Sequence, residues 1–214
     1  MENSIRFAVA PTLQEGGVML TSAQLAVLAE IAGPEAIMEM TSFHQLYVEM
    51  PGSSLDDITP RLEAVGLEVY PVGFVTKSLI ACHFCRGAEE SGLDTAQAIN
   101  KVIAGIPTPY PMKIGYAGCP IATSEPLLKD IGIVKMRDTF DIYIGGEAKT
   151  IKEMRIAELF RSNVTANELL ILIPSMIQAY AEHAKNKERF HRFLKRNTLE
   201  KYKEWVQECL IRAS

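Results

Sequence analysis

The sequence predicts an α+β protein, with an antiparallel-rich sheet, helices packed on one face and a helical tail at the C-terminus. Three observations lead to this class. Short strand-like runs recur through the first two thirds of the chain, capping-box patterns mark two helix starts, and the last third has helical spacing. The chain has 214 residues, 48% of them hydrophobic, which is enough to bury a core.

The first third of the chain has the order strand, helix, strand, strand, helix, strand. Residues 5–9 alternate in polarity like a half-buried strand, and the capping box of Thr21 and Gln24 opens a helix that Gly33-Pro34 ends. The expected apolar face of this helix consists of Leu25, Leu28 and Ile31. The remaining elements are strands at 37–40 and 46–50, a helix that begins near Ser54 and ends at Gly66, and a strand at 67–70.

The rest of the chain continues with strands and then turns helical. The middle third is predicted to contain strands at 78–81, 112–117, 131–134 and 140–144 and a helix at 94–104. In the last third, Thr165 and Glu168 form a second capping box, which opens a helix with an expected kink at Pro174. Two shorter helices follow, the second beginning near Asn197. We expect the mixed charges of residues 185–196 on a solvated helix face.

Three clustered cysteines are the strongest chemical signal. Cys82 and Cys85 form a C-x2-C pair after one predicted strand, and Cys119 follows another. Because cysteines in a reducing compartment seldom form disulfides, this pattern predicts an iron–sulfur or zinc site, or the remnant of one. No fourth cysteine accompanies them, but His83 could complete a zinc site. The alternative is that all are small buried apolar residues, which is our interpretation of Cys209.

Charge and hydropathy exclude several classes of protein. The formal net charge of −4 argues against binding to nucleic acid or to anionic membranes, which requires a basic surface. No apolar run approaches the roughly 20 residues that span a bilayer. The first residues lack the basic and apolar regions of a signal peptide. We therefore expect a cytoplasmic protein.

Motifs recur along nearly the whole chain, at residues 16–25, 41–46, 81–82, 113–114, 118–120, 130–134, 140–146 and 188–193. In their order and spacing they resemble those of the siroheme and iron–sulfur nitrite/sulfite reductase family. The resemblance implies a ferredoxin-like half at residues 1–72, followed at 73–214 by a cluster and siroheme α/β domain with C-terminal helices. Two ferredoxin-like halves usually build one site in that family, so it also implies a homodimer or a partner subunit.

The resemblance implies a [4Fe–4S] cluster held by Cys82, Cys85 and Cys119, with siroheme beside it. The chain departs from the family's cysteine pattern at two places. The family spaces its first cysteine pair more widely, and its last cysteine, which bridges cluster and siroheme iron, is replaced by Thr123. A threonine hydroxyl is a poor ligand for the iron of a cluster, because it is hard and difficult to deprotonate. The replacement therefore argues against direct coupling of the family type.

The cationic side chains that surround the oxyanion in that family are better preserved. Arg6 matches an arginine, Lys77 stands where a second arginine is usual, and Lys113 matches a lysine. We expect these three to be the catalytic cations, since reduction of an oxyanion needs protons and compensating positive charge. Pro111 and Phe43 replace two further cations of the family. His44, next to Phe43, could ligate iron or pair with a tetrapyrrole carboxylate, although an ordinary structural role also explains it.

Three functions follow from these residues. The first is a redox protein that reduces a small oxyanion with an iron–sulfur cluster and siroheme. The second is a non-catalytic accessory protein that binds a tetrapyrrole or an anion on the same fold, suggested by Thr123, Phe43 and Pro111. The third is a structural protein whose C-x2-C pair holds zinc or nothing.

Overall fold

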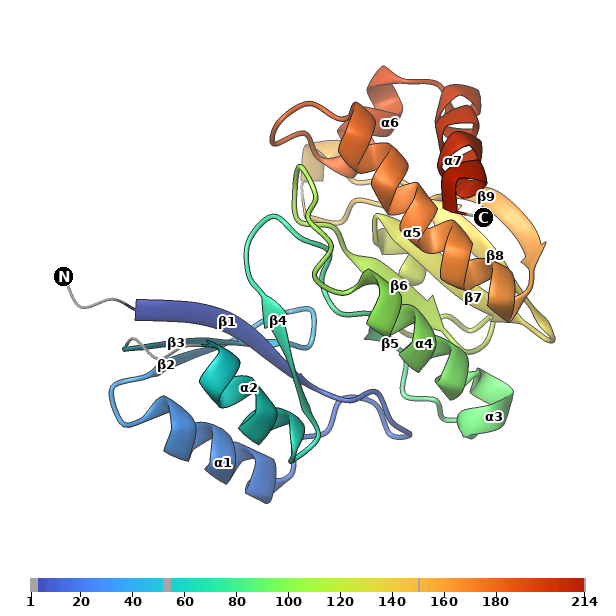
Figure 1. Cartoon of the computed structure of the whole chain (residues 1–214). Helices are drawn as coiled ribbons and strands as arrows, with labels where there is room; N and C mark the ends of the chain where they lie inside the picture. The colour runs from blue at the N-terminus through green and yellow to red at the C-terminus, as the bar shows by residue number, and fades with distance from the viewer. Residues whose placement is uncertain (1–3, 52–54, 150, 214) are drawn as a thin grey trace.

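The computed structural model describes residues 4–51, 55–149 and 151–213, which form two units with separate hydrophobic cores (Figure 1). Helices and sheets occur in both units, so the predicted α+β class is confirmed. No helix of the described residues is long and apolar enough to span a bilayer. The predicted boundary between residues 72 and 73 falls in the connection between the units and stays a prediction.

The N-terminal unit has the predicted order of elements and a ferredoxin-like sheet. These elements are β1 (Ser4–Pro11), α1 (Ser22–Ala32), β2 (Ile37–Met40), β3 (Leu46–Pro51), α2 (Leu55–Glu63) and β4 (Leu67–Pro71). The strands pair antiparallel in the order β2-β3-β1-β4, and both helices cover one face (Figure 1). Because side chains alternate along a strand, Phe7 and Val9 pack against the helices. Arg6 and Tyr47 lie on the opposite face.

The sequence predicted the start of the first helix correctly, but it predicted the buried face of that helix less well. The capping box is present, with the Thr21 hydroxyl accepting from the Gln24 amide and the Gln24 side chain accepting from the Thr21 amide. Leu28 is fully buried, but Leu25 is 43% exposed, so the apolar face is narrower than predicted. Ser54, the expected start of the second helix, lies outside the described residues.

The C-terminal unit is built on a mixed sheet. Its strands are β5 (Ile80–Ala81), β6 (Ile114–Ala117), β7 (Ile131–Met136), β8 (Thr139–Ile144) and β9 (Glu158–Val164). Its helices are α3 (Ala88–Ser91), α4 (Leu93–Ile103), α5 (Ala166–His183), α6 (Phe190–Arg196) and α7 (Leu199–Ala213), with 3-10 turns η1 (Pro126–Leu128) and η2 (Ile151–Glu153). The strand order follows the chain; β5, β6 and β7 are parallel, and the rest pair antiparallel.

Helices cover one face of the mixed sheet and η1 covers the other. Isoleucines of β7 and β8 join residues of α4, α5 and α7 in one core, and Figure 1 shows α4 and α5 on this face. On the opposite face, Gly132 makes room for η1, because a Cβ at this position would lie 2.5 Å from the Pro126 carbonyl oxygen. The turn η1 therefore rests directly on the sheet.

Some elements differ from the predictions. The strand expected from residue 78 begins only at Ile80, and α5 continues to His183 through Pro174. The sequence patterns predicted neither α3, which has a single turn, nor β9. In β9 the alternation is broken, since its register against β8 shifts twice, so its polar residues carry no strand pattern. The Thr165–Glu168 capping box and the two following helices are as predicted.

Candidate functional site

Two parallel strands bring the three cysteines together. Cys82 follows β5 and Cys119 follows β6 after one residue. Because these strands are parallel neighbours, their carboxyl ends lie at the same edge of the sheet. The Gly118 amide donates to the Cys82 sulfur over 3.2 Å, which links the two strand ends directly. Phe84, in a left-handed conformation, then turns the chain so that Cys85 follows at the surface.

Close backbone approach shapes the second half of this edge. A Cβ at Gly118 would lie 2.7 Å from the Ser91 carbonyl oxygen, so only glycine allows the end of α3 to pack against the cysteine turn. After Cys119, the Ala122 amide donates to its carbonyl oxygen over 3.1 Å, and Ala122 adopts a positive φ. This tight turn carries the chain back, so that Thr123 follows on the same side.

The side chains line one cavity of about 250 Å³, which we call the thiol cavity. Its lining consists of Cys82, Cys85, Cys119 and Thr123 together with Arg86, Ser91, Gly118 and Ile121. In the part of the chain that the structure describes, no three His, Cys, Asp or Glu side chains could hold a metal ion. A single zinc ion is therefore not accommodated as the residues stand. A cluster is a different case, because each thiolate binds its own iron atom and they need not converge on one point.

The two histidines near the predicted site point elsewhere. The His83 ring packs over Gly17, where a Cβ would come within 2.2 Å of it, and His83 does not line the thiol cavity. His44 is exposed, has a φ of 65° and borders a separate small cavity. Burial, and then the charges of His83 and Lys129, lower the pKa of His44. His83 thus lies outside the cavity in which it could complete a zinc site, and a cofactor-binding role for His44 stays a prediction.

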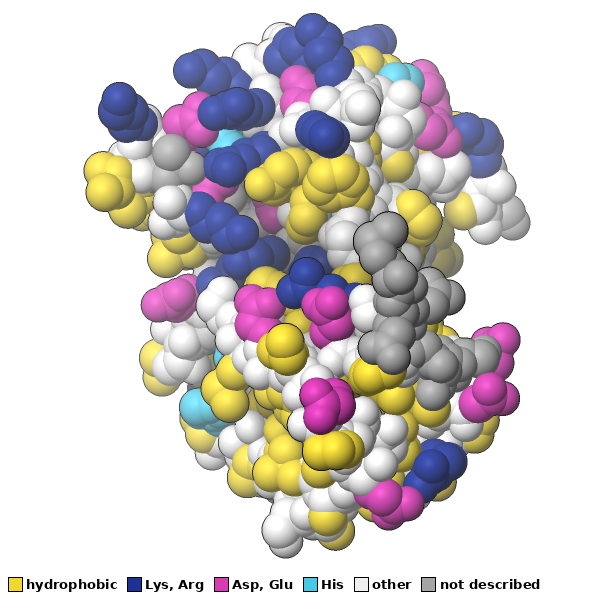
Figure 2. Space-filling model, turned by 90° about the vertical axis from the view of Figure 1, so that its left-hand side faces the viewer, with side chains coloured by type: hydrophobic (Ala, Val, Ile, Leu, Met, Phe, Trp, Pro, Cys, Tyr) yellow, Lys and Arg dark blue, Asp and Glu magenta, His cyan; other side chains and the backbone are white. Residues whose placement is uncertain are grey.

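The predicted catalytic cations meet around two aromatic rings between the units. The Lys77 ammonium lies 5.7 Å from the centroid of Phe43 and 5.6 Å from that of Tyr47, and the Lys113 ammonium lies 5.0 Å from Phe43. The Arg6 guanidinium is 5.3 Å from Tyr47 and pairs with Glu39 at 2.9 Å. We call these three cations with the two rings the cation cluster. Figure 2 shows basic side chains gathered at the level where the units meet.

Burial lowers the pKa values of both lysines. It lowers the pKa of Lys77 to about 8, with a further contribution from the neighbouring charge of Lys149. The pKa of Lys113 is also lowered to about 8 by burial and by Lys149. Lys77 nevertheless donates to the Gly73 carbonyl oxygen over 3.1 Å. Two lysines with such values can bind an anion at neutral pH and can also release a proton to it.

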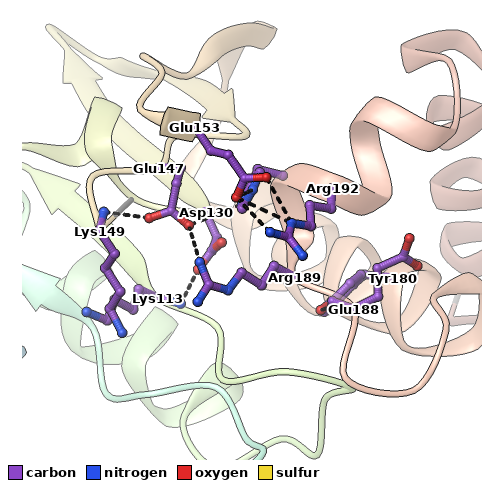
Figure 3. A network of polar contacts seen from close by, with 10 residues as sticks. Lys113, Asp130, Glu147, Lys149, Glu153, Tyr180, Glu188, Arg189 and Arg192 are labelled. Atoms are coloured by element: carbon purple, nitrogen blue, oxygen red, sulfur yellow. Dashed lines mark hydrogen bonds and ion pairs between the residues drawn. The ribbon is translucent and has the colours of Figure 1, made fainter. Parts of the chain in front are cut away.

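Sequence reasoning missed the acidic network behind the cation cluster (Figure 3). Asp130 accepts from the Lys113 amide over 2.8 Å, and burial raises the pKa of Asp130 to about 7. Glu147 accepts from the Lys149 amide over 2.6 Å. Asp130 begins the motif at residues 130–134 and Glu147 follows the one at 140–146, but neither motif indicated an acidic network.

Two spaces of very different size adjoin these groups. A cavity of about 80 Å³, bordered by Lys113, Asp130 and Lys149, has room for a small oxyanion but not for a macrocycle. A groove of about 990 Å³ borders the thiol cavity at Arg86, Gly118 and Cys119. This groove is large enough for a macrocycle. It also carries Lys135 and Arg137, with acidic residues among them.

The architecture defines the class of protein: a ferredoxin-like sheet joined to a mixed sheet that presents cysteines at one edge. The family described as "Nitrite and sulphite reductase 4Fe-4S domain" matches residues 76–212. The chain belongs to this family, and the resemblance inferred from the motifs is confirmed.

Individual relatives have several functions. The chain is 30% identical to cobalt-factor III methyltransferase of Priestia megaterium over 92% of its own length and 36% of that protein. It is 26% identical to nitrite reductase [NAD(P)H] of Bacillus subtilis, covering 89% of this chain and 24% of the relative. It is 24% identical to the assimilatory-type sulfite reductase of Nitratidesulfovibrio vulgaris, covering 79% and 78%. The chain thus spans about a third or less of the first two relatives.

Solved structures agree on the fold. Dissimilatory sulfite reductase I matches with a TM-score of 0.73 at 12% identity, over 95% of this chain and 68% of that one. The NirA protein of Mycobacterium tuberculosis matches with a TM-score of 0.55 at 19% identity, over 94% and 39%. These likenesses support the fold class predicted from the sequence.

Proposed function

We propose that the chain is a redox protein that holds a [4Fe–4S] cluster in the thiol cavity and binds a small oxyanion at the cation cluster. The observation that carries the proposal is that Cys82, Cys85 and Cys119, from separate turns, line one cavity. A bound cluster would supply one-electron transfer. The Gly118 amide, which donates to the Cys82 sulfur, would stabilise negative charge on this ligand.

The cation cluster would attract the oxyanion and supply protons. Lys113 borders the small cavity, and Lys77 contacts the same Phe43 ring, so both ammonium groups face the space between the units. Reduction of an oxyanion consumes protons, and a lysine with a pKa of about 8 is a suitable donor near neutral pH. Arg6, which stays charged, would hold the anion, in competition with Glu39.

Anaerobic reconstitution with iron and sulfide tests the cluster. We expect four irons and four sulfides per chain, and the replacements Cys82→Ser, Cys85→Ser and Cys119→Ser should each lower this content strongly. Cys209→Ser is the matched control, because Cys209 is buried in the core and does not line the thiol cavity. Thr123→Cys should make the cluster more resistant to chelators, since a fourth thiolate would complete the set.

Two results would contradict the cluster proposal. If the wild-type protein takes up no acid-labile sulfide, or if Cys209→Ser loses as much iron as the cavity variants, the cluster proposal is wrong. Zinc in the native protein without sulfide would indicate the structural function instead.

A second candidate function is a non-catalytic protein that binds a tetrapyrrole. Two observations favour it: the Phe43 ring packs against both lysines in place of a further cation, and Thr123 stands in the cavity where the family has a cysteine. The similarity to a methyltransferase named for a cobalt factor also points towards macrocycle chemistry. The groove beside Cys119 would be the place for the ring. Titration with siroheme and with a metal-free precursor measures tetrapyrrole binding. An assay of nitrite and sulfite reduction then separates the two candidates, because only the first function requires this reaction.

The resemblance also leads us to propose a second copy of the chain or a partner subunit that completes the ligand site. We also propose a cytoplasmic location, because a cluster requires reduced cysteines.

A further inference from the structure

The turn after β1 reaches from the N-terminal unit to the C-terminal unit, and we call its residues 13–17 the β1 turn (Figure 1). Leu13 is only 7% exposed and belongs to the hydrophobic core of the C-terminal unit. The Gln97 side chain of α4 donates to the Leu13 carbonyl oxygen over 2.8 Å. The turn then closes on itself, because the Gly17 amide donates to the Gln14 carbonyl oxygen over 3.1 Å. It is therefore packed against the second unit, although it precedes α1.

One end of the cysteine loop, residues 83–88, is attached to the β1 turn through His83. The Gly16 amide donates to the His83 carbonyl oxygen over 2.9 Å. The His83 ring lies over Gly17, where a Cβ would come within 2.2 Å of it. Gly17 also has a φ of 89°, which glycine adopts at little cost. A residue without a side chain thus allows this close contact.

The other end of the cysteine loop is attached through Glu15. Ala88 is the first residue of α3, and Gly87 before it provides no side-chain cap for this helix. A Glu15 carboxylate oxygen accepts from the Ala88 amide, so the N-terminal unit supplies the missing cap. Because a helix of a single turn is unstable on its own, we expect α3 to depend on this contact.

Both attachments restrict Cys85, which lies between them in the chain. The loop is closed by the Gly87 amide, which donates to the Phe84 carbonyl oxygen over 3.0 Å, and the Phe84 ring is buried in the core. Fixing both ends of such a loop removes much of its conformational freedom. Cys82, by contrast, is held by the sheet, since its amide donates to the Tyr116 carbonyl oxygen over 3.0 Å. The β1 turn therefore bears on Cys85 more than on Cys82.

We propose that the β1 turn is a positioning element of the cluster site, which holds Cys85 at the thiol cavity through Glu15 and Gly17. The role rests on the proposed function in that the cavity holds the cluster. A loop that opens less often exposes bound iron less often to solvent and to chelators. The N-terminal unit thereby contributes to cluster retention, although none of its described residues lines the thiol cavity.

Hydrogen exchange in the protein without a cluster, read amide by amide by NMR, tests the attachment directly. Glu15→Ala and Gly17→Ala should each speed exchange of the Gly87 amide about tenfold, because the loop opens more often once one attachment is lost. The Cys82 amide in the sheet is the internal control and should exchange as in the wild type. Equal acceleration at both amides would indicate general destabilisation and would overturn the proposal.

Two further variants separate these contacts from side effects of the substitutions. Glu15→Gln keeps an oxygen that can accept from the Ala88 amide, so it should retain most of the protection that Glu15→Ala loses. Gly33→Ala is the matched control for Gly17→Ala, because Gly33 also has a positive φ, of 79°, but a Cβ there would meet no described atom within 4 Å. If Gly33→Ala speeds exchange at Gly87 as much as Gly17→Ala does, backbone strain alone explains the effect and the proposal is wrong.

Iron release tests the link to the cluster. In reconstituted protein, Glu15→Ala and Gly17→Ala should release iron to a chelator several-fold faster than the wild type, whereas Glu15→Gln and Gly33→Ala should not. Unchanged release in the first two variants, despite faster exchange at Gly87, would overturn the proposal. Failure of the proposed function has a different signature: the wild-type protein then takes up no acid-labile sulfide, while exchange at Gly87 still decides whether the β1 turn holds the loop.

Discussion

At the scale of single residues, Lys77 and Lys113 are the two buried cations of the proposed oxyanion site. Their contacts with Phe43 arise because a turn of the N-terminal unit meets loops of the C-terminal unit. Burial removes water from the ammonium groups, which disfavours their charged form and lowers their pKa values. The site therefore changes its charge within a narrow range of pH.

This predicts a pH dependence of anion binding. Below pH about 8 both lysines carry a charge, and above it they lose it, so the affinity for nitrite should fall as the pH rises through this value. Calorimetric titration of nitrite at increasing pH measures the effect, since the charge of nitrite itself does not change there. Lys113→Met should weaken binding and flatten the profile, whereas Lys195→Met, on α6, should do neither. An unchanged affinity up to strongly alkaline pH would contradict the assignment.

The sequence correctly predicted which residues lie close together where these residues belong to a family motif. Arg6, Lys77 and Lys113 were expected to lie together from the resemblance, and the structure brings them together around the same rings. Lys149 lies outside these motifs, and the motif at residues 188–193 did not indicate that His191 contacts Glu147 in the segment after β8. The charged stretch around residue 190 was expected on a solvated face, but His191 is buried.

Among the elements, η1 and β7 show how closely packed the C-terminal unit is. Gly132→Ala should destabilise the protein, because the new Cβ would meet the Pro126 backbone, which cannot move away like a flexible side chain. We expect a loss of about 1–3 kcal/mol in the free energy of unfolding in urea, the usual cost of overpacking. Lys135→Ala in the same strand is the control and should stay within about 0.5 kcal/mol of wild type. Equal stability of Gly132→Ala and wild type would show that η1 can shift.

Elements defined by local contacts were predicted, and those defined by distant contacts were not. Both capping boxes correctly marked helix starts, since their hydrogen bonds span three residues. The strand β9 was missed because its pairing with β8 is irregular, and β5 is shorter than its apolar run suggested. The mixed direction of the second sheet likewise depends on pairings that no local pattern encodes.

At the scale of the whole molecule, Asn100 of α4 connects the two units. Its side-chain oxygen accepts from the Leu79 amide over 2.8 Å, and its nitrogen donates to Glu68 at 3.0 Å and Tyr70 at 2.8 Å. Glu68 and Tyr70 belong to β4 of the N-terminal unit, whereas Leu79 precedes β5. One buried amide thus joins a strand, a helix and the connection between the units.

Asn100→Ala should therefore destabilise the protein. The Leu79 amide would be left buried without an acceptor, at a cost of about 1–3 kcal/mol. Urea unfolding measures the loss, and hydrogen exchange should show faster exchange at Leu79. Gln178→Ala, which removes an exposed pair with Glu182, is the control. Unaltered exchange at Leu79 would mean that other contacts hold the units together.

The position of Cys85 has a practical consequence. This thiol lies at the surface, at the mouth of the cavity that also contains Cys119. A metal–sulfide core bound there would face the solvent on one side, where dioxygen and peroxide can reach it and where no fourth sulfur shields it. If the proposed cluster is bound, protein handled in air should bleach and lose its brown colour, and the cell would have to protect or rebuild the cluster.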